Sequence, residues 1–386
     1  MEGGPGAVGR IVYGARMPRS LSDEELRLLR LRAQRLAGGP ATSVHEVVRG
    51  VGALQAQDTR AARLAVRARS ERLTAAAVAR ACNEDRSVVR TWAMRGTLHM
   101  LPTEDLGWLV ALLGPVFAAA GGRRRRQLGL DEATCERGLA AIAAVLADEG
   151  PFSRAELVGR LAAEGVVLDA RSQAPAHLVA YAANRGLICR GPDLDGDEPS
   201  YVLLAEWAGE QRELAPEAAL AELARRYLAG HGPAGARDFA AWSGLPAARA
   251  RRGLELIAGE LDEVRAGERH LWTLAAAADP VGVERPSVRL LGHFDAYLLG
   301  YRGRELVLDP RFARRIQAGG GFVQPALLVD GRVAGTWRQQ RRRDRLTVQV
   351  EPFEALDRAV LPGLEAEVGD LGRFLGAEAT PAVAGG

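Results

Sequence analysis

Hydrophobic residues over the first part of the chain recur mostly at helical spacing, and polar capping residues mark where helices begin. After Ser22, leucine and alanine residues return every three or four positions as far as Leu36, which is the period of one buried helix face. Ser22 and Glu25 fit the Ser-x-x-Glu capping box, and the same box begins at Ser43 and at Ser153. The pattern predicts helices that start directly after these three serines.

A second group of helices is expected after Pro216, a residue type that suits the first turn of a helix. We expect this helix to run to about Leu228, with two more at about residues 236–242 and 247–257. Three pairs of strand-like segments predict β-hairpins: residues 88–92 with 97–101, 187–190 with 201–204, and the segment around Val264 with 270–274. Helices followed by a hairpin, three times over, indicate tandem winged-helix units of about 80 to 100 residues.

The C-terminal quarter of the chain has a different pattern. Short apolar runs are separated by glycine, proline and aspartate, and Asp330-Gly331 between two of the runs is a strong hairpin signal. The runs lie at residues 288–291, 306–308, 326–329, 333–337 and 346–350. They predict a small antiparallel sheet or barrel, closed by a helix from about Pro352 to Leu375.

Together these patterns predict an α+β fold with three tandem winged-helix motifs followed by a small C-terminal antiparallel β-barrel. The first residues are rich in glycine and arginine and are expected to form a disordered tail. The expected boundaries are 1–20 for the tail, 21–125, 126–212 and 213–280 for the three winged-helix units, and 281–386 for the barrel-like domain with its C-terminal helix.

The composition is that of an ordinary globular protein, with 47% hydrophobic and 26% charged residues. We find no stretch of 18 uncharged apolar residues and no apolar N-terminal leader, so we expect neither a transmembrane helix nor a secretory signal. The three cysteines are scattered, which favours a reducing cytoplasm. We therefore expect neither a membrane partner nor a disulfide framework.

Nothing in the sequence favours a metal site, and no cofactor is expected. The six histidines are dispersed rather than spaced as metal ligands. Asp193, Asp195 and Asp197 resemble the start of a calcium loop, but the glycine and the bidentate glutamate of such a loop are missing. We interpret these aspartates as a solvated hairpin tip.

All 51 basic residues are arginine, and the chain has no lysine. It therefore has no side-chain amine for a Schiff base and no P-loop lysine. Guanidinium groups bind phosphates in bidentate fashion, and although a solvated face explains any single cluster more readily, several clusters on winged-helix units favour nucleic acid. The clusters are Arg123–Arg126, Arg225-Arg226, Arg251-Arg252, Arg314-Arg315, and Arg338 with Arg341–Arg343 and Arg345.

Two polar segments are candidates for chemistry. Gln55-Ala-Gln57-Asp58 is expected to end the helix that begins after Ser43, and spacing alone favours a surface polar turn there. Arg95, Thr97 and His99 lie on the first predicted hairpin, where Gly96 permits a tight turn and the three side chains could share one face. A polar hairpin face is common, and His99 alone is more often a structural histidine. Beside the glutamine pair, the same face would suit contact with DNA.

Taken as a set, these residues are similar to those of the AlkZ/YcaQ-type winged-helix DNA glycosylases of bacteria. The matching stretches span nearly the whole chain: residues 31–36 (LRAQRL), 54–58 (LQAQD), 89–99 (VRTWAMRGTLH), 225–233 (RRYLAGHGP), 238–245 (DFAAWSGL), 294–301 (FDAYLLGY) and 330–337 (DGRVAGTW). The resemblance implies three winged-helix motifs and a β-barrel that form a C-shaped clamp on duplex DNA. It also implies a catalytic Gln-x-Gln motif, which falls on Gln55 and Gln57.

Glutamine rather than aspartate at position 57 places the chain nearer the AlkZ-like branch. That branch is associated with removal of bulky N7-alkylpurine adducts and crosslinks, including damage from a producer's own genotoxic metabolites. A neutral amide is a poor base but can orient a water molecule, so we expect cationic N7- or N3-alkylpurines, which leave without being protonated, as substrates. The lack of lysine predicts a monofunctional enzyme, because lyase chemistry needs an amine.

We expect the partner to be double-stranded DNA, bound by a monomer in the cytoplasm and at the nucleoid. Arg95, Thr97, His99, Asp58 and Arg338 are candidate DNA contacts, and Asp58 could also stabilise charge or cap a helix. Two other functions stay open from the sequence: a transcriptional regulator without catalysis, since winged helices more often regulate, and a binding protein that sequesters a genotoxic drug.

Overall fold

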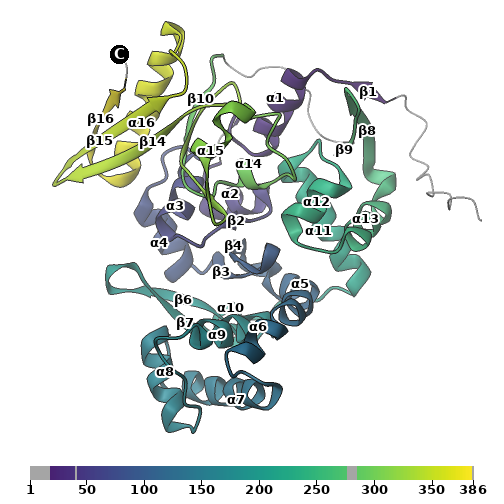
Figure 1. Ribbon diagram of the computed structural model, residues 1–386, viewed down its shortest axis with the longest axis vertical. Helices are drawn as coiled ribbons and strands as arrows, with labels where there is room; N and C mark the ends of the chain where they lie inside the picture. Colours follow the sequence, from purple (N-terminus) through teal and green to yellow (C-terminus); the bar gives the residue numbers. More distant parts are fainter. Residues whose placement is uncertain (1–17, 40, 276–284, 385–386) are drawn as a thin grey trace, which may run out of the picture.

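The computed structural model describes residues 18–39, 41–275 and 285–384. Helices and strands are mixed along the whole described chain, so the predicted α+β class is confirmed. Figure 1 shows a C-terminal sheet at the upper left, one group of helices at the right and another at the bottom, with residues of about 44–102 between them. This central segment carries the candidate glutamines, so its fold determines where they lie.

One order of elements, helix–strand–helix–helix–strand–strand, occurs twice in full and a third time without the first strand. In the first unit (residues 44–102) the elements are α2 (Val44–Val51), β2 (Leu54–Gln55), α3 (Thr59–Arg67), α4 (Ala75–Asn83), β3 (Val88–Trp92) and β4 (Leu98–Pro102). In each of the first two units the short first strand pairs antiparallel with the last strand, and the last two strands form a hairpin.

The second unit (residues 132–203) repeats this order in full, and the third unit (residues 216–274) repeats it without the first strand. The second contains α7 (Glu132–Glu149), β5 (Phe152–Ser153), α8 (Arg154–Ala163), α9 (Ala174–Asn184), β6 (Ile188–Leu194) and β7 (Glu198–Leu203). The third contains α11 (Pro216–His231), α12 (Ala236–Ser243), α13 (Ala247–Leu256), β8 (Leu261–Ala266) and β9 (Arg269–Leu274), with a single bridge from Ala234 to Trp272 in place of the first strand. All three predicted hairpins are therefore present, the second with longer strands than predicted.

Helices α5 (Leu106–Ala120) and α6 (Gly122–Gln127) join the first unit to the second, and α10 (Leu204–Ala208) leads towards the third. The sequence predicted no transmembrane helix, but by length and composition alone the stretch Thr103–Ala120 could cross a membrane. Half of this stretch is buried inside the protein. Trp108, Leu109 and Leu113 pack in a core shared with α11 and α12, which explains the apolar sequence without a membrane.

The predicted helix starts are correct where a serine caps the helix locally. Ser22 begins α1 (Asp23–Ala33) and Ser153 begins α8, each with both bonds of the capping box. Ser43 accepts the backbone N–H of Glu46 at the start of α2, but the Glu46 carboxylate accepts from the N–H of Thr42 instead of completing the box. The capping serine is thus sufficient to start the helix in all three cases.

The predicted tail is partly ordered. Residues 1–17 lie outside the described part of the chain, but Arg19–Ser20 form a short strand, β1, which pairs parallel with β8. The prediction of a tail over all of residues 1–20 is therefore wrong at its end, because two backbone positions join the sheet of the third unit.

The C-terminal region is a curled half-barrel rather than the predicted fully antiparallel barrel. Its five strands follow the order β10 (Val288–Leu291), β13 (Ala326–Val329), β14 (Arg332–Arg342), β15 (Arg345–Pro352) and β16 (Glu378–Val383). The pairing of β15 with β16 is parallel, which the sequence did not predict. Parallel pairing requires a crossover between the strands, and α16 (Leu361–Leu375) provides it.

Two further C-terminal predictions are wrong. Helix α16 begins at Leu361 and not near Pro352, because Pro352 still belongs to β15. The apolar run 306–308 forms a turn rather than a strand, and its three side chains are buried against a core that includes Leu31 and Tyr297. Between β10 and β13 lie α14 (Ala296–Leu299), α15 (Ala313–Ile316) and the small hairpin of β11 (Gln317–Gly319) and β12 (Phe322–Val323).

Candidate active site

The two glutamines lie on and just after β2, not at the end of a helix as predicted. Helix α2 ends at Val51, and Gly52 follows with a left-handed φ of 84°, which glycine adopts without steric cost. The chain then turns into β2, where Gln55 pairs with His99 of β4, and the N–H of Ala56 donates to the carbonyl of Leu98 at 2.8 Å. The motif is therefore part of a sheet edge.

Protein donors hold the carbonyl ends of both amides. The half-buried Gln55 accepts a hydrogen bond at Oε1 from Nη2 of Arg95, at 2.8 Å. The exposed Gln57 accepts at Oε1 from the backbone N–H of Leu98, at a longer 3.4 Å. Each bond leaves the NH₂ group of the amide and one carbonyl lone pair free for other partners.

Arg95 lies in the tight turn Met94–Gly96 between β3 and β4. Its guanidinium also donates from Nη1 to the backbone carbonyl of Trp242 in α12, at 2.6 Å. Burial, and secondarily the charge of Arg304, lower the pKa of Arg95 to about 10, so the side chain is still a cation at neutral pH. Arg95 thus brings a positive charge directly against the first glutamine.

Thr97 and His99 lie beside this turn but differ in exposure. Thr97 is half-buried, and its hydroxyl donates to the carbonyl of Met94 at 3.2 Å. Only 2% of His99 is exposed, and its Nδ1 lies 2.9 Å from the carbonyl of Thr97. Burial, aided by the nearby Arg95 cation, lowers the pKa of His99 to about 3, so its ring is neutral at physiological pH. His99 therefore supports β4, the strand that pairs with Gln55.

Asp58 follows the motif and starts α3. Its Oδ1 accepts the backbone N–H of Ala61 at 2.8 Å, which is the bond of a helix N-cap, while the side chain stays exposed. Arg338 lies elsewhere, on the C-terminal sheet, where Nε donates to Oε1 of Gln349 at 2.5 Å and the side chain is exposed. The structure therefore gathers every predicted site residue except Arg338 around β2 and β4.

Comparison with known proteins gives this arrangement its family. A family model described as DNA glycosylase AlkZ-like matches residues 48–374, which include the motif, the turn and most of the C-terminal sheet. This chain belongs to the AlkZ-like DNA glycosylase family. The predicted resemblance and the predicted enzyme class, a DNA glycosylase, are both confirmed.

Two matches come from Streptomyces sahachiroi. An interstrand DNA cross-link repair glycosylase is 30% identical over 315 residues, which cover 77% of this chain and 81% of the relative. The solved structure of Streptomyces sahachiroi DNA glycosylase AlkZ matches with a TM-score of 0.79 at 26% identity, covering 94% of this chain and 100% of that one. The glycosylase described here therefore shares its fold with an AlkZ over almost its whole length.

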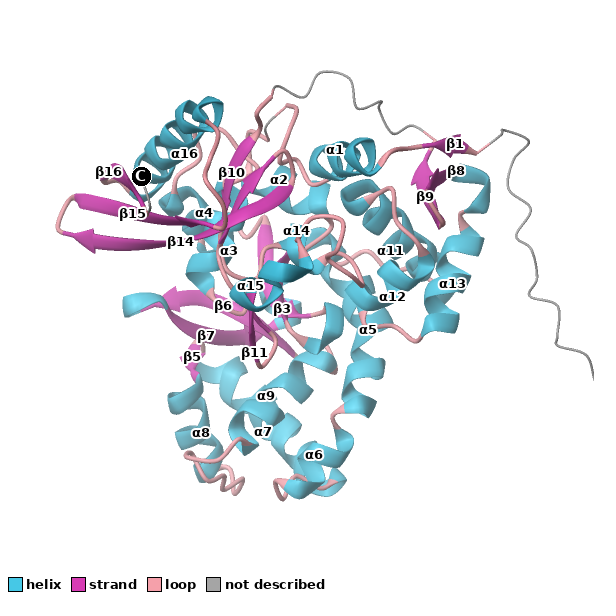
Figure 2. Cartoon of the chain, turned by 45° about the horizontal axis from the view of Figure 1, so that its top comes forward, coloured by secondary structure: helices cyan, strands magenta, loops and turns pink. Residues whose placement is uncertain are grey.

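Two of the arginine clusters of this glycosylase have different surroundings. Arg225 and Arg226 are ion-paired within the protein, to Glu222, Glu260 and Asp105, so they stabilise the third unit and its contact with α5. The tip of the β14–β15 hairpin is different: all eight residues from Arg338 to Arg345 are exposed. Figure 2 shows this hairpin projecting from the body of the protein, which leaves its arginines available to a large partner.

Of the three aspartates interpreted as a solvated hairpin tip, Asp193 and Asp197 are ion-paired instead, while Asp195 is exposed. Asp197, at the turn between β6 and β7, accepts two bonds from Arg63 of α3, at 2.7 and 3.2 Å. Asp193 accepts from Arg90 of β3 at 2.6 Å. These pairs fasten the hairpin of the second unit to the first unit beside the motif. Among the residues that the structure describes, no cluster of three or more metal-ligating side chains occurs.

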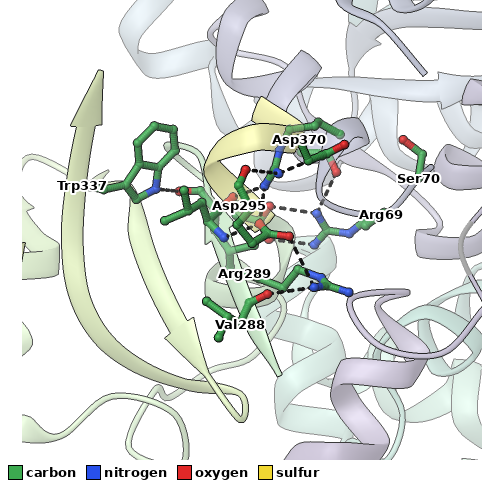
Figure 3. Close-up of polar contacts among 12 residues, drawn as sticks. Arg69, Ser70, Val288, Arg289, Asp295, Trp337 and Asp370 are labelled. Atoms are coloured by element: carbon green, nitrogen blue, oxygen red, sulfur yellow. Dashed lines mark hydrogen bonds and ion pairs between the residues drawn. The ribbon is translucent and has the colours of Figure 1, made fainter. Parts of the chain in front are cut away.

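A second network, which sequence reasoning missed, joins the first unit to the C-terminal region (Figure 3). Arg69, just beyond α3, donates two bonds to Asp295, at 2.7 and 2.8 Å, and both side chains are fully buried. Arg67 pairs with Glu367 and Asp370 of α16 at 2.8 and 3.0 Å. The partners are separated by more than two hundred residues in the chain, so no local pattern could have indicated them.

Proposed function

We propose that this glycosylase hydrolyses the N-glycosidic bond of cationic N7- or N3-alkylpurines in duplex DNA. The observation that carries the proposal is the placement of Gln55 and Gln57 on one sheet edge, with both carbonyl groups fixed by protein donors. Because the relative from Streptomyces sahachiroi is named an interstrand DNA cross-link repair glycosylase, the proposed substrates include bulky adducts and interstrand crosslinks, removed in repair or in self-resistance.

The chemistry follows from what an amide can and cannot do. Water oxygen bonds to C1′ while the C1′–N9 bond breaks, its electron pair neutralises the cationic base, and the water proton passes to solvent. Ordinary glycoside hydrolysis uses one carboxyl to protonate the leaving group and another to activate water. A purine that already carries positive charge needs no such acid, and two amides that position the water meet the remaining requirement.

Asp58 is proposed to contribute charge as well as a helix cap. One of its oxygens caps α3, and the exposed carboxylate lies one residue from Gln57, where it would oppose the positive charge that develops on the sugar. Arg338 and Thr97 are proposed as DNA contacts, because Arg338 is exposed and half-buried Thr97 lies beside the motif. His99 was expected to be a further contact, but its burial supports a role in holding β4 against the motif.

We interpret each of the three units as a winged-helix motif, because the recurring order of elements is that of the winged-helix fold. With boundaries at residues 21–125, 126–212, 213–280 and 281–386, the motifs and the half-barrel would form a C-shaped clamp, able to act on duplex DNA as a monomer in the cytoplasm. The exposed β14–β15 arginines would bind phosphates and make affinity dependent on salt.

The decisive test is base release from a duplex that contains N7-methylguanine. Gln55→Ala and Gln57→Ala should each lower the single-turnover rate by about 100-fold, since misplacement of a reacting water costs that much, while DNA affinity changes little. Gln173→Ala is a matched control, because Gln173 also accepts a bond from an arginine, Arg124, but lies in the second unit. Sequence-specific DNA binding without base release would instead indicate a regulator, and tight binding of a free alkylating drug would indicate sequestration.

The same reaction tests the monofunctional assignment. Since the chain has no lysine, the products should be the free base and an intact abasic strand. Strand scission, with a covalent adduct trapped by borohydride, would show that the N-terminal amine acts as a lyase nucleophile and would contradict the assignment.

The DNA role of Arg338 has its own measurement. Arg338→Ala should reduce the slope of log affinity against log salt by about 1, the change expected when one phosphate contact is lost. Arg311→Ala provides the control, because Arg311 is exposed and ion-paired with Asp309 and Glu354, as Arg338 is with Glu351, but lies outside the β14–β15 hairpin. Equal slopes for wild type and Arg338→Ala would exclude the contact.

A further inference from the structure

Arg95 has an unusual backbone conformation for a large residue. Its φ is 57° and ψ is 14°, in the left-handed region, and Gly96 follows with φ 66°. A residue with a side chain is uncommon there and costs on the order of 1–3 kcal/mol, so it persists only where the surrounding structure holds it. The contacts that hold Arg95 therefore indicate which function the strained turn serves.

The turn is pressed between two helices. A Cβ built on Gly96 would lie 3.3 Å from the ring of Phe117 in α5. A Cβ built on Gly244, the left-handed C-cap of α12, would lie 2.8 Å from Cα of Arg95. The backbone of the turn therefore touches the end of α12 directly, and Arg95 meets the third unit through both its backbone and its side chain.

The guanidinium of Arg95 joins two distant parts of the chain. Nη1 donates to the carbonyl of Trp242 at 2.6 Å, and Nη2 donates to Oε1 of Gln55 at 2.8 Å. The Trp242 side chain is packed against the rings of Tyr227 and His231, so the carbonyl that receives Arg95 belongs to a rigid cluster. The cation is thus fixed by the third unit and in turn fixes the glutamine.

This contact selects one orientation of the Gln55 amide. An amide has an acceptor end and a donor end, whereas a guanidinium has donors only. Arg95 can therefore face only the oxygen of Gln55, and the NH₂ group must point elsewhere. Without Arg95, the two orientations would differ little in energy, since the amide could turn its NH₂ or its oxygen towards water.

We propose that Arg95 is a positioning residue, which holds the Gln55 amide in one orientation against the third unit so that its NH₂ group faces the substrate. The inference rests on the proposed role of Gln55, and it replaces the expectation that Arg95 mainly binds DNA. The left-handed turn is the means by which a side chain from a hairpin reaches both Trp242 and Gln55.

The first test separates positioning from DNA binding. Glycine adopts φ 57° without strain, so Arg95→Gly removes the guanidinium while preserving the turn. The single-turnover rate of base release at saturating enzyme should fall about 100-fold, with less than a threefold change in the Kd for duplex DNA. Arg72→Gly is the matched control, because Arg72 is also an arginine with a left-handed φ of 61° but is exposed. A weaker Kd with an unchanged rate would overturn the proposal.

A double-mutant cycle then shows whether Arg95 acts through Gln55. In the Gln55→Ala background, Arg95→Gly should cause no further loss of rate, because the group that Arg95 positions is already gone. Losses that multiply would contradict the proposal. Gln55→Glu retains an oxygen for Arg95 but replaces the NH₂ by a second oxygen, so it should lose as much rate as Gln55→Ala. Full activity of Gln55→Glu would show that the oxygen is the working end.

A spectroscopic measurement keeps the inference separate from the proposed reaction. In protein labelled with ¹⁵N-glutamine, the side-chain amide signal of Gln55, assigned from its absence in Gln55→Ala, should shift and broaden in Arg95→Gly and stay unchanged in Arg72→Gly. An unchanged signal in Arg95→Gly overturns the positioning role. Wild-type protein that releases no base, with this shift still present, would instead contradict only the proposed function.

Discussion

The first and second units have the same order of elements, but they differ where the first strand meets the next helix. In the second unit β5 ends on Ser153, which is itself the N-cap of α8. In the first unit β2 ends on Gln55, and the N-cap of α3 is Asp58. Ala56 and Gln57 lie between the end of β2 and the N-cap Asp58, and Gln57 completes the motif. The comparison teaches that the candidate chemistry comes from a longer junction in a repeated fold rather than from the fold itself.

The hairpins of the two units also differ in what holds them. The turn between β3 and β4 is held by Trp242 of the third unit, through Arg95. The turn between β6 and β7 is held by Arg63 of the first unit, through Asp197. Each hairpin is therefore fixed by another unit, and only the first uses that contact to reach a glutamine.

The largest expected effect concerns the ion pairs that hold the first unit to the C-terminal region and the second unit to the first. Asp295→Asn should lower the free energy of unfolding by about 3–5 kcal/mol, because it leaves the buried Arg69 cation without its counter-charge. Asp197→Asn should cost less than about 1 kcal/mol, since that ion pair is partly exposed to solvent. Denaturant unfolding of the two variants beside wild type measures both changes. Equal losses would show that the first unit is not fastened more firmly than the second.

Local signals predicted α1, α2, α8 and the hairpins of both units, but not α3, α4, α7, α9, β2 or β5. Ser22 and Ser153 cap their helices with neighbouring residues, so their positions follow from sequence. The strand β2 was missed because an apolar run up to Leu54 continues the helical pattern, and only the turn at Gly52 and pairing with β4 reveal the strand.

The sequence likewise indicated some residues of the candidate site but not the contacts that hold them. Resemblance to a family indicated Gln55 and Gln57, and spacing placed Arg95 near them in a turn. The partner of Arg95 is a backbone carbonyl, at Trp242, and every residue type has one, so no sequence pattern can indicate it. The burial of His99 also depends on the packing of three units, and a polar residue on a hairpin does not reveal it.

Acid should destabilise the first and third units through their buried histidines. Burial lowers the pKa of His99 and of His231 to about 3 each, whereas the unfolded chain takes up these protons near pH ~6.5. The resulting stability is present above pH ~6.5 and is lost as pH falls towards 3. Between pH 7 and 5 each histidine should cost about 2 kcal/mol.

Unfolding free energies of wild type and His99→Gln at these two pH values measure the effect. The variant should show a pH dependence smaller by about 2 kcal/mol than that of wild type, whatever its stability at pH 7. His270→Gln, which changes an exposed histidine of the third unit, is the control. A pH dependence that His99→Gln leaves unaltered would mean that His99 is protonated in the folded protein.

The smallest effect concerns the two caps at the junction where the units differ. Ser153→Ala and Asp58→Ala should each cost about 1 kcal/mol of stability, the usual value for a lost N-cap. Asp58→Asn keeps a capping oxygen, so stability should be retained, but one negative charge near the developing cation is lost, worth on the order of 1–2 kcal/mol. Base release by Asp58→Asn should therefore fall about tenfold, while Ser153→Ala releases base at the wild-type rate. If Asp58→Asn is fully active, Asp58 is a cap like Ser153, and the two junctions differ in their glutamines alone.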